Sequence, residues 1–166
     1  MVIMSGPNSV AFCGLSLESQ TALSEALVRL DVLSIEPPVR PEELAAAITL
    51  RDALRRSFEA AARGEPLSPR DVETLNSYAA DEPPLVALSA QGTVRRIAVD
   101  PARCALSELA RDGIGVIALR AHDLRRCQGC GAFFLDESRG KRRRWCSMER
   151  CGNRAKVAGY RARRQR

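Results

Sequence analysis

Four cysteines near the end of the sequence have the spacing of a metal site. Cys127 and Cys130 form one pair, Cys146 and Cys151 form a second, and 15 residues separate the pairs. Cysteines paired in this way can bring four thiolates to one tetrahedral ion, each roughly 2.3 Å from the metal. The spacing predicts a Zn²⁺ site; the alternatives are an iron cluster and a redox or chance arrangement of thiols. Four protein ligands leave no open position on the metal, so we expect structural zinc and no enzyme activity.

The other candidate ligands are few. Cys13 and Cys104 each stand alone, without a second cysteine at metal-site spacing, and we expect both to be small hydrophobic side chains in the core. His122 is the only histidine. It is expected to be exposed, because four thiolates already complete a tetrahedral site.

The sequence has the features of a cytoplasmic protein. Its start carries neither a basic leader nor a sustained apolar stretch, and no apolar run approaches the roughly 20 residues that cross a bilayer. Disulfides rarely persist in a reducing cytoplasm, whereas thiolate metal sites do. We therefore expect no membrane partner, and we expect the four cysteines to bind a metal.

Charge is distributed unevenly along the chain. Residues 1–124 carry 12 Arg or Lys against 17 Asp or Glu, and residues 125–166 carry 14 against 3. The net charge of +6 therefore combines an acidic part with a strongly basic part that surrounds the cysteines. So dense a positive patch predicts a polyanionic partner, although an exposed charged surface without a partner is the simpler alternative.

The acidic part contains several amphipathic helix patterns. Residues 16–30 show apolar side chains at spacings of three and four. A second helix is predicted over 41–63, with Pro41 at its first position and Gly64 as its stop, and a third begins after Ser68 as N-cap. The predicted inward-facing residues are Leu23, Leu27, Leu30, Ala47, Leu50, Leu54, Phe58, Ala61, Val72, Leu75 and Tyr78.

A change of period then predicts a β-hairpin. Two apolar runs, 85–90 and 93–99, flank the dipeptide Gln91-Gly92, which is typical of a two-residue turn. The last helix of this part is expected to start at Pro101.

Together these elements predict an α+β protein with two parts. Residues 1–120 are expected to form a mostly helical domain with one β-hairpin, and residues 121–166 a treble-clef-like zinc finger. Glycines at positions 113 and 115 weaken the helical pattern near the end of the first part. The finger needs a metal because roughly 40 residues bury too little apolar surface to fold alone.

Within the finger, Gly129 and Gly131 are expected to shape a tight zinc knuckle. Residues 132–136 and 141–145 alternate in polarity about a turn and predict two antiparallel strands. A C-terminal helix is expected to begin at the second cysteine pair. The predicted apolar contacts of the finger come from Phe133, Phe134 and Trp145, and from Ala155, Ala158 and Ala162 packing back onto the hairpin.

The finger resembles the CGNR zinc-finger family. The resemblance rests on the elements FLDESR, RRRWCSM and CGNRAK, the last of which contains Cys151, Gly152, Asn153 and Arg154. Members of that family usually carry an N-terminal ABATE domain, to which LRDALRRSFEAAARGEPLSPRDVETLN is similar. The resemblance implies a bacterial stress-response transcription regulator, with the four cysteines as zinc ligands and the basic finger on DNA.

The candidate nucleic-acid-binding residues are the cations around the second cysteine pair and their polar and aromatic neighbours. They are Arg142, Arg143, Arg144, Asn153, Arg154, Lys156, Tyr160, Arg161, Arg163 and Arg164. Asn153 and Arg154 are candidates for contacts with base edges, but Asn153 is equally suited to capping a helix or bracing the knuckle.

These features support three functional hypotheses. The first is a transcription regulator whose finger binds duplex DNA while its helical domain senses a small-molecule effector or forms a homodimer. The second is an RNA- or ribosome-associated zinc protein, because the electrostatic attraction does not distinguish between polyanions. The third is a protein-interaction module whose arginines meet an acidic partner, including the acidic part of its own chain.

Overall fold

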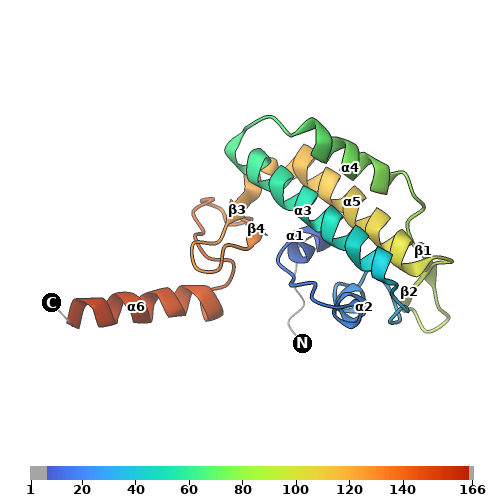
Figure 1. Ribbon diagram of the computed structural model, residues 1–166. Helices are drawn as coiled ribbons and strands as arrows, with labels where there is room; N and C mark the ends of the chain where they lie inside the picture. Colours follow the sequence, from blue (N-terminus) through green and yellow to red (C-terminus); the bar gives the residue numbers. More distant parts are fainter. Residues whose placement is uncertain (1–6, 165–166) are drawn as a thin grey trace.

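The computed structural model describes residues 7–164, apart from the side chains at positions 159, 162 and 163 (Figure 1). The fold class is α+β, as the sequence predicts. Short hairpins accompany the helices, a 3₁₀ turn (η1) follows α5 and a π-type turn (η2) precedes α6. The elements are α1 (Asn8–Phe12), α2 (Gln20–Arg29), α3 (Pro41–Arg63), α4 (Pro69–Ala79), β1 (Leu85–Leu88), β2 (Val94–Ile97), α5 (Pro101–Arg120), η1 (Ala121–Asp123), β3 (Leu124–Arg126), β4 (Phe133–Leu135), η2 (Met148–Gly152) and α6 (Asn153–Arg164).

Helices α3, α4 and α5 lie side by side and form the body of the molecule (Figure 1). Helix α3 begins at Pro41 and ends at Gly64, whose φ of 69° gives the left-handed cap that the sequence predicts. Helix α4 returns antiparallel to it. A bidentate ion pair joins the two helices, with the Arg56 Nη2 2.6 Å from Oδ1 of the buried Asp71. The short connection and the ion pair together hold α4 against α3.

The N-terminal segment supplies two shorter helices. The helix predicted over 16–30 is confirmed as α2, but it starts later, because the Ser19 hydroxyl accepts the Ala22 amide at 3.1 Å and acts as the N-cap. Helix α1 was not predicted, since five residues are too few to show a helical period. Its Phe12 is fully buried against the same core that receives Leu23 and Leu27 of α2.

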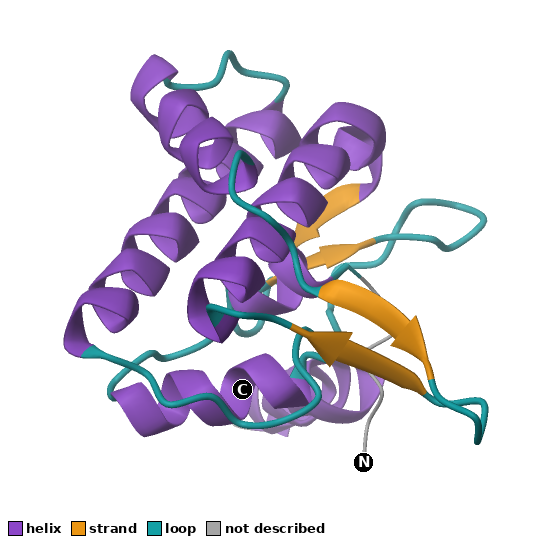
Figure 2. Ribbon diagram, turned by 90° about the vertical axis from the view of Figure 1, so that its right-hand side faces the viewer, coloured by secondary structure: helices purple, strands orange, loops and turns teal. Residues whose placement is uncertain are grey.

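The predicted first hairpin is confirmed, but its turn is longer than the predicted dipeptide. The Ser89 amide donates to the Thr93 carbonyl at 2.9 Å, so residues 90–92 form a three-residue loop. Strands β1 and β2 pair antiparallel, with Leu85 opposite Ile97 and Leu88 opposite Val94. Figure 2 shows this hairpin at the edge of the helical body. The side chains of all four residues are exposed, so the hairpin contributes little to the core of this chain.

The two glycines of α5 have opposite surroundings, although both lie inside the helix. A Cβ at Gly113 would lie 2.2 Å from Cδ2 of the fully buried Leu54, whereas a Cβ at Gly115 would meet nothing within 4 Å. Gly113 therefore allows α5 to approach α3 closely. The helix continues through both glycines to Arg120 because this packing outweighs their low helix propensity.

Alanine substitutions at these glycines are expected to change stability in opposite directions. Gly113→Ala overpacks the α3–α5 contact and should lower the free energy of unfolding by about 1–3 kcal/mol. Gly115→Ala, the matched control, should raise it by roughly 0.5–1 kcal/mol, because it restricts the unfolded chain and favours the helix. Urea unfolding followed by circular dichroism measures both. Equal effects of the two substitutions would contradict the packing argument.

The second hairpin differs from its prediction. Strand β4 pairs with β3, in the register Leu124 to Leu135, and the predicted second strand over 141–145 is an irregular loop. Lys141 adopts a left-handed conformation with φ of 48°, which no regular strand allows. The loop still reaches the knuckle, since the Gln128 amide donates to the carbonyl oxygen of Arg144 at 2.9 Å. The zinc knuckle is therefore the turn of the β3–β4 hairpin.

Two predictions about the apolar contacts of the finger are wrong. Phe133 belongs to the main core, where its ring meets Phe58 of α3 edge-on at a centroid distance of 5.7 Å. Helix α6 does not pack back onto the hairpin: Ala155 is half-buried, Ala158 is exposed, and the helix extends away from the rest of the chain (Figure 1). The Ala162 side chain lies outside the described residues.

Candidate metal centre and nucleic-acid interface

The four predicted cysteines come together in one cluster. The sulfur atoms of Cys127, Cys130, Cys146 and Cys151 all lie within 4.8 Å of one another. Sγ of Cys146 lies 3.6 Å from Sγ of Cys130 and 3.8 Å from Sγ of Cys151. Four sulfurs at 2.3 Å from a central ion form a tetrahedron with an edge of about 3.8 Å, so these distances fit Zn²⁺ with little rearrangement.

Three structural elements bring the cysteines together. Cys127 follows β3, and its amide donates to the Ala132 carbonyl at 2.8 Å, which closes the knuckle that carries Cys130. Cys146 ends the irregular loop. Ser147 then caps the η2 turn, with its hydroxyl accepting the Arg150 amide at 3.4 Å, and Cys151 lies within that turn. The helix start predicted at the second cysteine pair is therefore a capped π-type turn that leads into α6.

Glycines give the cysteines room to approach one another. Gly131 adopts a φ of 74°, the left-handed conformation that the sequence predicts for the knuckle. Gly129 is needed for space: a Cβ there would lie 3.1 Å from Cβ of Cys151 and 3.5 Å from Cε3 of Trp145. A side chain at 129 would push the two halves of the cluster apart.

The cluster is electrostatically prepared for a cation. Burial would raise the pKa of Cys127, but backbone amides of Cys146, Gly129 and Cys130 outweigh it and lower that pKa to about 6. Burial and the neighbouring thiols raise the pKa of Cys146 to about 12. The Cys127 thiolate therefore forms readily, whereas Cys130 and Cys146, whose pKa values are raised by burial, need a positive charge nearby before they lose their protons. A bound Zn²⁺ supplies that charge.

Neighbouring side chains shield and orient the sulfurs. Cys127 and Cys151 are buried together with Phe134, and half-buried Trp145 packs beside them. The Arg154 guanidinium donates to Sγ of Cys151 at 3.5 Å. Such a contact stabilises the thiolate form of a ligand from outside the coordination sphere. Arg154 thus has a function inside the finger, in addition to its predicted place on the nucleic-acid surface.

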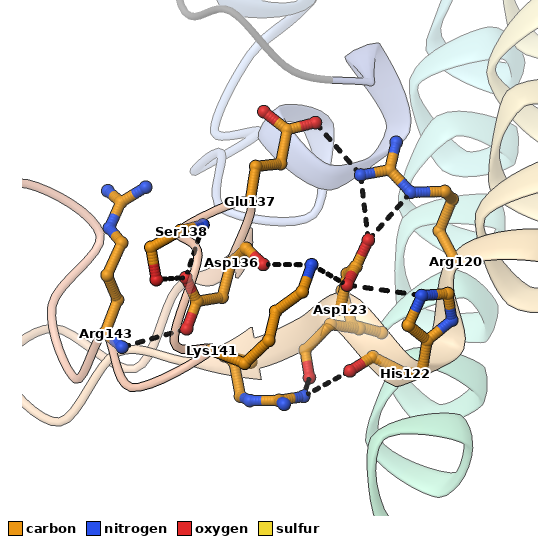
Figure 3. A network of polar contacts seen from close by, with 10 residues as sticks. Arg120, His122, Asp123, Asp136, Glu137, Ser138, Lys141 and Arg143 are labelled. Carbon is orange, nitrogen blue, oxygen red and sulfur yellow. Dashed lines mark hydrogen bonds and ion pairs between the residues drawn. The ribbon is translucent and has the colours of Figure 1, made fainter.

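A polar network attaches the finger to the end of α5 (Figure 3). Arg120 donates to Asp123 at 3.0 Å and to Glu137 at 2.9 Å, and Lys141 pairs with Asp123. The ammonium group of Lys141 also donates to the carbonyl oxygen of Asp136 at 2.8 Å. Hydrogen bonding to Lys141, followed by that to Arg120, holds the pKa of Asp123 below its usual value. These hydrogen bonds therefore favour the charged form of the Asp123 carboxylate.

Asp136 fixes the path of the irregular loop. Its carboxylate is fully buried and accepts the Ser138 amide at 3.0 Å and the Arg143 amide at 2.8 Å. Burial would raise its pKa, but these hydrogen bonds and that of the Ser138 hydroxyl outweigh burial and lower it. The loop that delivers Cys146 is thus held by a buried charge and not by the strand pairing expected from the sequence.

The helical part and the finger share their core. Leu124 of β3 is fully buried in the main cluster together with Phe133, and Arg126 pairs with Glu59 of α3 at 3.1 Å. The finger's hairpin is consequently packed on the helical body, and only the segment after Cys151 leaves it (Figure 1).

The predicted nucleic-acid-binding residues lie in two exposed segments on either side of Cys146. In the loop, the Arg143 guanidinium lies 5.2 Å from the ring centroid of Phe134 and the Arg144 guanidinium 5.7 Å from that of Trp145. The Arg163 side chain lies outside the described residues. The remaining predicted residues are exposed; they are Arg142 in the loop and Asn153, Arg154, Lys156, Tyr160, Arg161 and Arg164 on α6.

A mostly helical domain with a four-cysteine finger packed against it defines a zinc-finger protein, and Zn²⁺ is its cofactor. The chain belongs to the ABATE family, described as "Putative stress-induced transcription regulator", whose model matches residues 16–119. The CGNR zinc-finger model matches residues 124–164. No curated protein matches the sequence. Within residues 7–164, every helix is too short or too polar to form a transmembrane segment.

Some residues of the site carried too weak a sequence signal to be found. Strand β3 has three residues, too few to show alternation, and its only strongly apolar side chain is Leu124. Asp123 lies 18 residues before Lys141, and in the sequence Asp123, Asp136 and Lys141 look like ordinary surface charges. The sequence showed the FLDESR pattern in the finger. Only the structure shows that its Asp136 carboxylate is buried and holds the following loop.

Proposed function

We propose that this protein is a cytoplasmic, DNA-binding transcription regulator of bacteria without enzyme activity. Zinc bound by Cys127, Cys130, Cys146 and Cys151 orders the finger, and α6 with the preceding loop contacts duplex DNA. The observation that carries the proposal is the exposed cationic helix α6, which starts at the metal site and extends away from the helical part, whose residues 1–124 are acidic (Figure 1).

Apart from Arg154, whose guanidinium donates to Sγ of Cys151, the described cations of α6 remain available for a partner. Among described residues, the finger's cations that form ion pairs are Arg126, with Glu59, and Lys141, with Asp123. Both precede α6. The positive charge of the helix is therefore not neutralised by the acidic part of the chain in this conformation, which favours an external polyanion over an intramolecular one.

Salt-titrated DNA binding tests the proposal. If about five cations contact phosphates, log K for a duplex should fall against log salt with a slope of roughly −4.5. Fluorescence anisotropy of a labelled duplex with zinc-loaded, full-length protein measures the slope. Absence of affinity at low salt would refute DNA binding, and preferential competition by structured RNA would favour the RNA-associated alternative.

We assign dimerisation to the helical part, through the β1–β2 hairpin. Of the exposed large hydrophobic side chains among the described residues, the hairpin strands contribute Leu85 (66% exposed), Val86 (60%), Leu88 (76%), Val94 (57%) and Ile97 (49%). A two-stranded hairpin with both faces in water is marginally stable, and a cluster of this kind marks an interaction surface.

A second copy of the chain is the partner that fits this hairpin. The hairpin presents the outer edge of β1 together with apolar side chains, and these can be self-complementary across a two-fold axis. The outer edge of β2 is partly covered, since the Arg96 amide donates to the Ser34 hydroxyl at 2.8 Å. A dimer would also place two α6 helices on one duplex, as DNA regulators that bind paired half-sites require.

Charged substitutions on the hairpin are expected to separate the protomers. Leu88→Lys combined with Val94→Lys places two positive charges on one cross-strand pair and should convert a dimer into a monomer in sedimentation velocity. Leu119→Lys on α5, at a residue that is 74% exposed, is the control and should remain dimeric. A wild-type protein that sediments as a monomer at high concentration would contradict the assignment.

A further inference from the structure

Helix α6 carries a line of four exposed side chains, of which only the last is a cation. Asn153, Val157, Tyr160 and Arg164 follow one another at spacings of four, three and four residues. At about 100° per residue these positions fall within roughly 60° of the helix circumference. Val157 is 49% exposed and Tyr160 54% exposed, so apolar surface lies at the centre of this line without a partner in the described part of the chain.

Cations lie on both flanks of this line. Arg161 falls about 80° to one side of Asn153 and Lys156 about 60° to the other. Both side chains are exposed. Arg154 lies on the flank of Arg161, but its guanidinium is directed to Sγ of Cys151. The helix thus presents a central ridge of mixed chemistry between two cationic edges.

The shape and position of α6 match the major groove of duplex DNA. A helix with its side chains is about 10–12 Å across, and the groove of B-DNA is about 12 Å wide. Twelve residues rise about 18 Å, enough to follow several base pairs. Because α6 extends away from the body, the groove walls meet no other element along most of its length (Figure 1).

The geometry points to α6 as the element that reads DNA sequence, with Asn153, Val157, Tyr160 and Arg164 facing base edges while Lys156 and Arg161 contact the phosphates of the two strands. This inference rests on the proposed DNA-binding function and specifies how it is carried out. It assigns the recognition of sequence to the ridge and the salt-dependent affinity to the flanks.

The chemistry of the ridge suits base edges. An asparagine amide can bind adenine at N6 and N7, an arginine can bind guanine at O6 and N7, and valine can contact the thymine methyl group. The Arg164 guanidinium lies 5.6 Å from the ring centroid of Tyr160, within the range of a cation–π contact. Double-stranded RNA is a poor fit, because its deep, narrow major groove excludes a helix.

The test compares sequence preference with general affinity. Wild-type, zinc-loaded protein first selects its preferred duplexes from a random pool, and affinities are then measured for a preferred and a scrambled duplex. Asn153→Ala, Val157→Ala and Tyr160→Ala should each reduce the ratio of the two affinities by about 5- to 100-fold. Affinity for the scrambled duplex and the salt slope should stay near the wild-type values.

Lys156→Gln is the matched control on the same helix. It should weaken binding to both duplexes equally, leave their ratio unchanged and make the salt slope shallower by roughly 0.9. Zinc content and helicity of every variant, measured in parallel, show that the finger is intact.

The outcomes separate this inference from the proposed function. Ridge variants with undiminished sequence preference would overturn the inference and leave DNA binding in place, as would a wild-type protein that selects no sequence from the pool. Failure of the zinc-loaded wild type to bind any duplex would overturn both.

Discussion

Replacing Cys146 with serine is expected to reduce bound zinc from one ion per chain to a small fraction and to abolish DNA binding. Cys146 is the residue through which the irregular loop reaches the other sulfurs, at 3.6 Å and 3.8 Å from its neighbours. Structural zinc sites contribute about 10–16 kcal/mol at neutral pH, more than the small cluster around Phe134 can replace. Plasma mass spectrometry of the purified protein measures the metal, and anisotropy measures DNA binding.

Cys104→Ser is the matched control for this experiment. Cys104 lies on α5, outside the four-cysteine cluster. It is half-buried, whereas Cys13, which is also outside the cluster, is buried. The variant should bind one zinc ion and retain its affinity for DNA. Stoichiometric zinc in Cys146→Ser, or loss of zinc in Cys104→Ser, would contradict the four-cysteine assignment.

Loss of zinc should also lower the stability of the helical part. Leu124 and Phe133 are part of the main core, so unfolding of β3 and β4 removes two buried side chains from it. Burial of such a side chain is worth about 1.5–3 kcal/mol. Chelation should therefore lower the Tm of the helical part. An unchanged Tm would show that the hairpin stays in place without the metal.

Removing two cations from α6 is expected to have the second large effect. Each phosphate contact raises the affinity about eightfold when salt is lowered from 1 M to 0.1 M. Lys156→Gln combined with Arg161→Gln removes two such contacts and should therefore weaken duplex binding about 60-fold at 0.1 M salt. The slope of log K against log salt should become shallower by roughly 1.8. Glutamine retains good helix propensity, so the helix itself is preserved.

The control for this pair removes the same charge elsewhere. Arg29→Gln combined with Arg70→Gln, on the helical part, changes the net charge equally. If contacts of α6 are responsible, this variant should bind with the wild-type slope. Equal losses in the two double variants would mean that overall charge, not α6, determines the affinity.

Local features of the fold were predictable from the sequence. Proline and glycine fix the ends of α3 through their own backbone restrictions, and the apolar spacing of Leu50, Leu54 and Phe58 identifies its buried face. The first hairpin follows from its two apolar runs and from Gly92 between them, whose φ of 75° suits a turn. The cysteine cluster was predictable for a similar reason, since a tetrahedral ion accepts only certain spacings.

Features that depend on which side chains become buried in the folded chain were not predictable. Alternation over 141–145 predicts a strand, but the buried carboxylate of Asp136 accepts the Arg143 amide and bends the segment into a loop. Leu124, with little pattern around it, supplies the strand instead. An aromatic residue next to a knuckle suggests a separate finger core, yet Phe133 packs on Phe58 because the hairpin lies on α3.

The sequence by itself determined the composition of this protein: a helical family domain, a basic zinc finger, and four ligands whose spacing is set by the geometry of the metal. Only the tertiary structure decided how they are joined. Burial of Leu124 and Phe133 attaches the hairpin to the helical body, since apolar side chains go where they lose most contact with water. Helix α6 packs on none of this core, and its described cations other than Arg154 remain exposed to meet a polyanion.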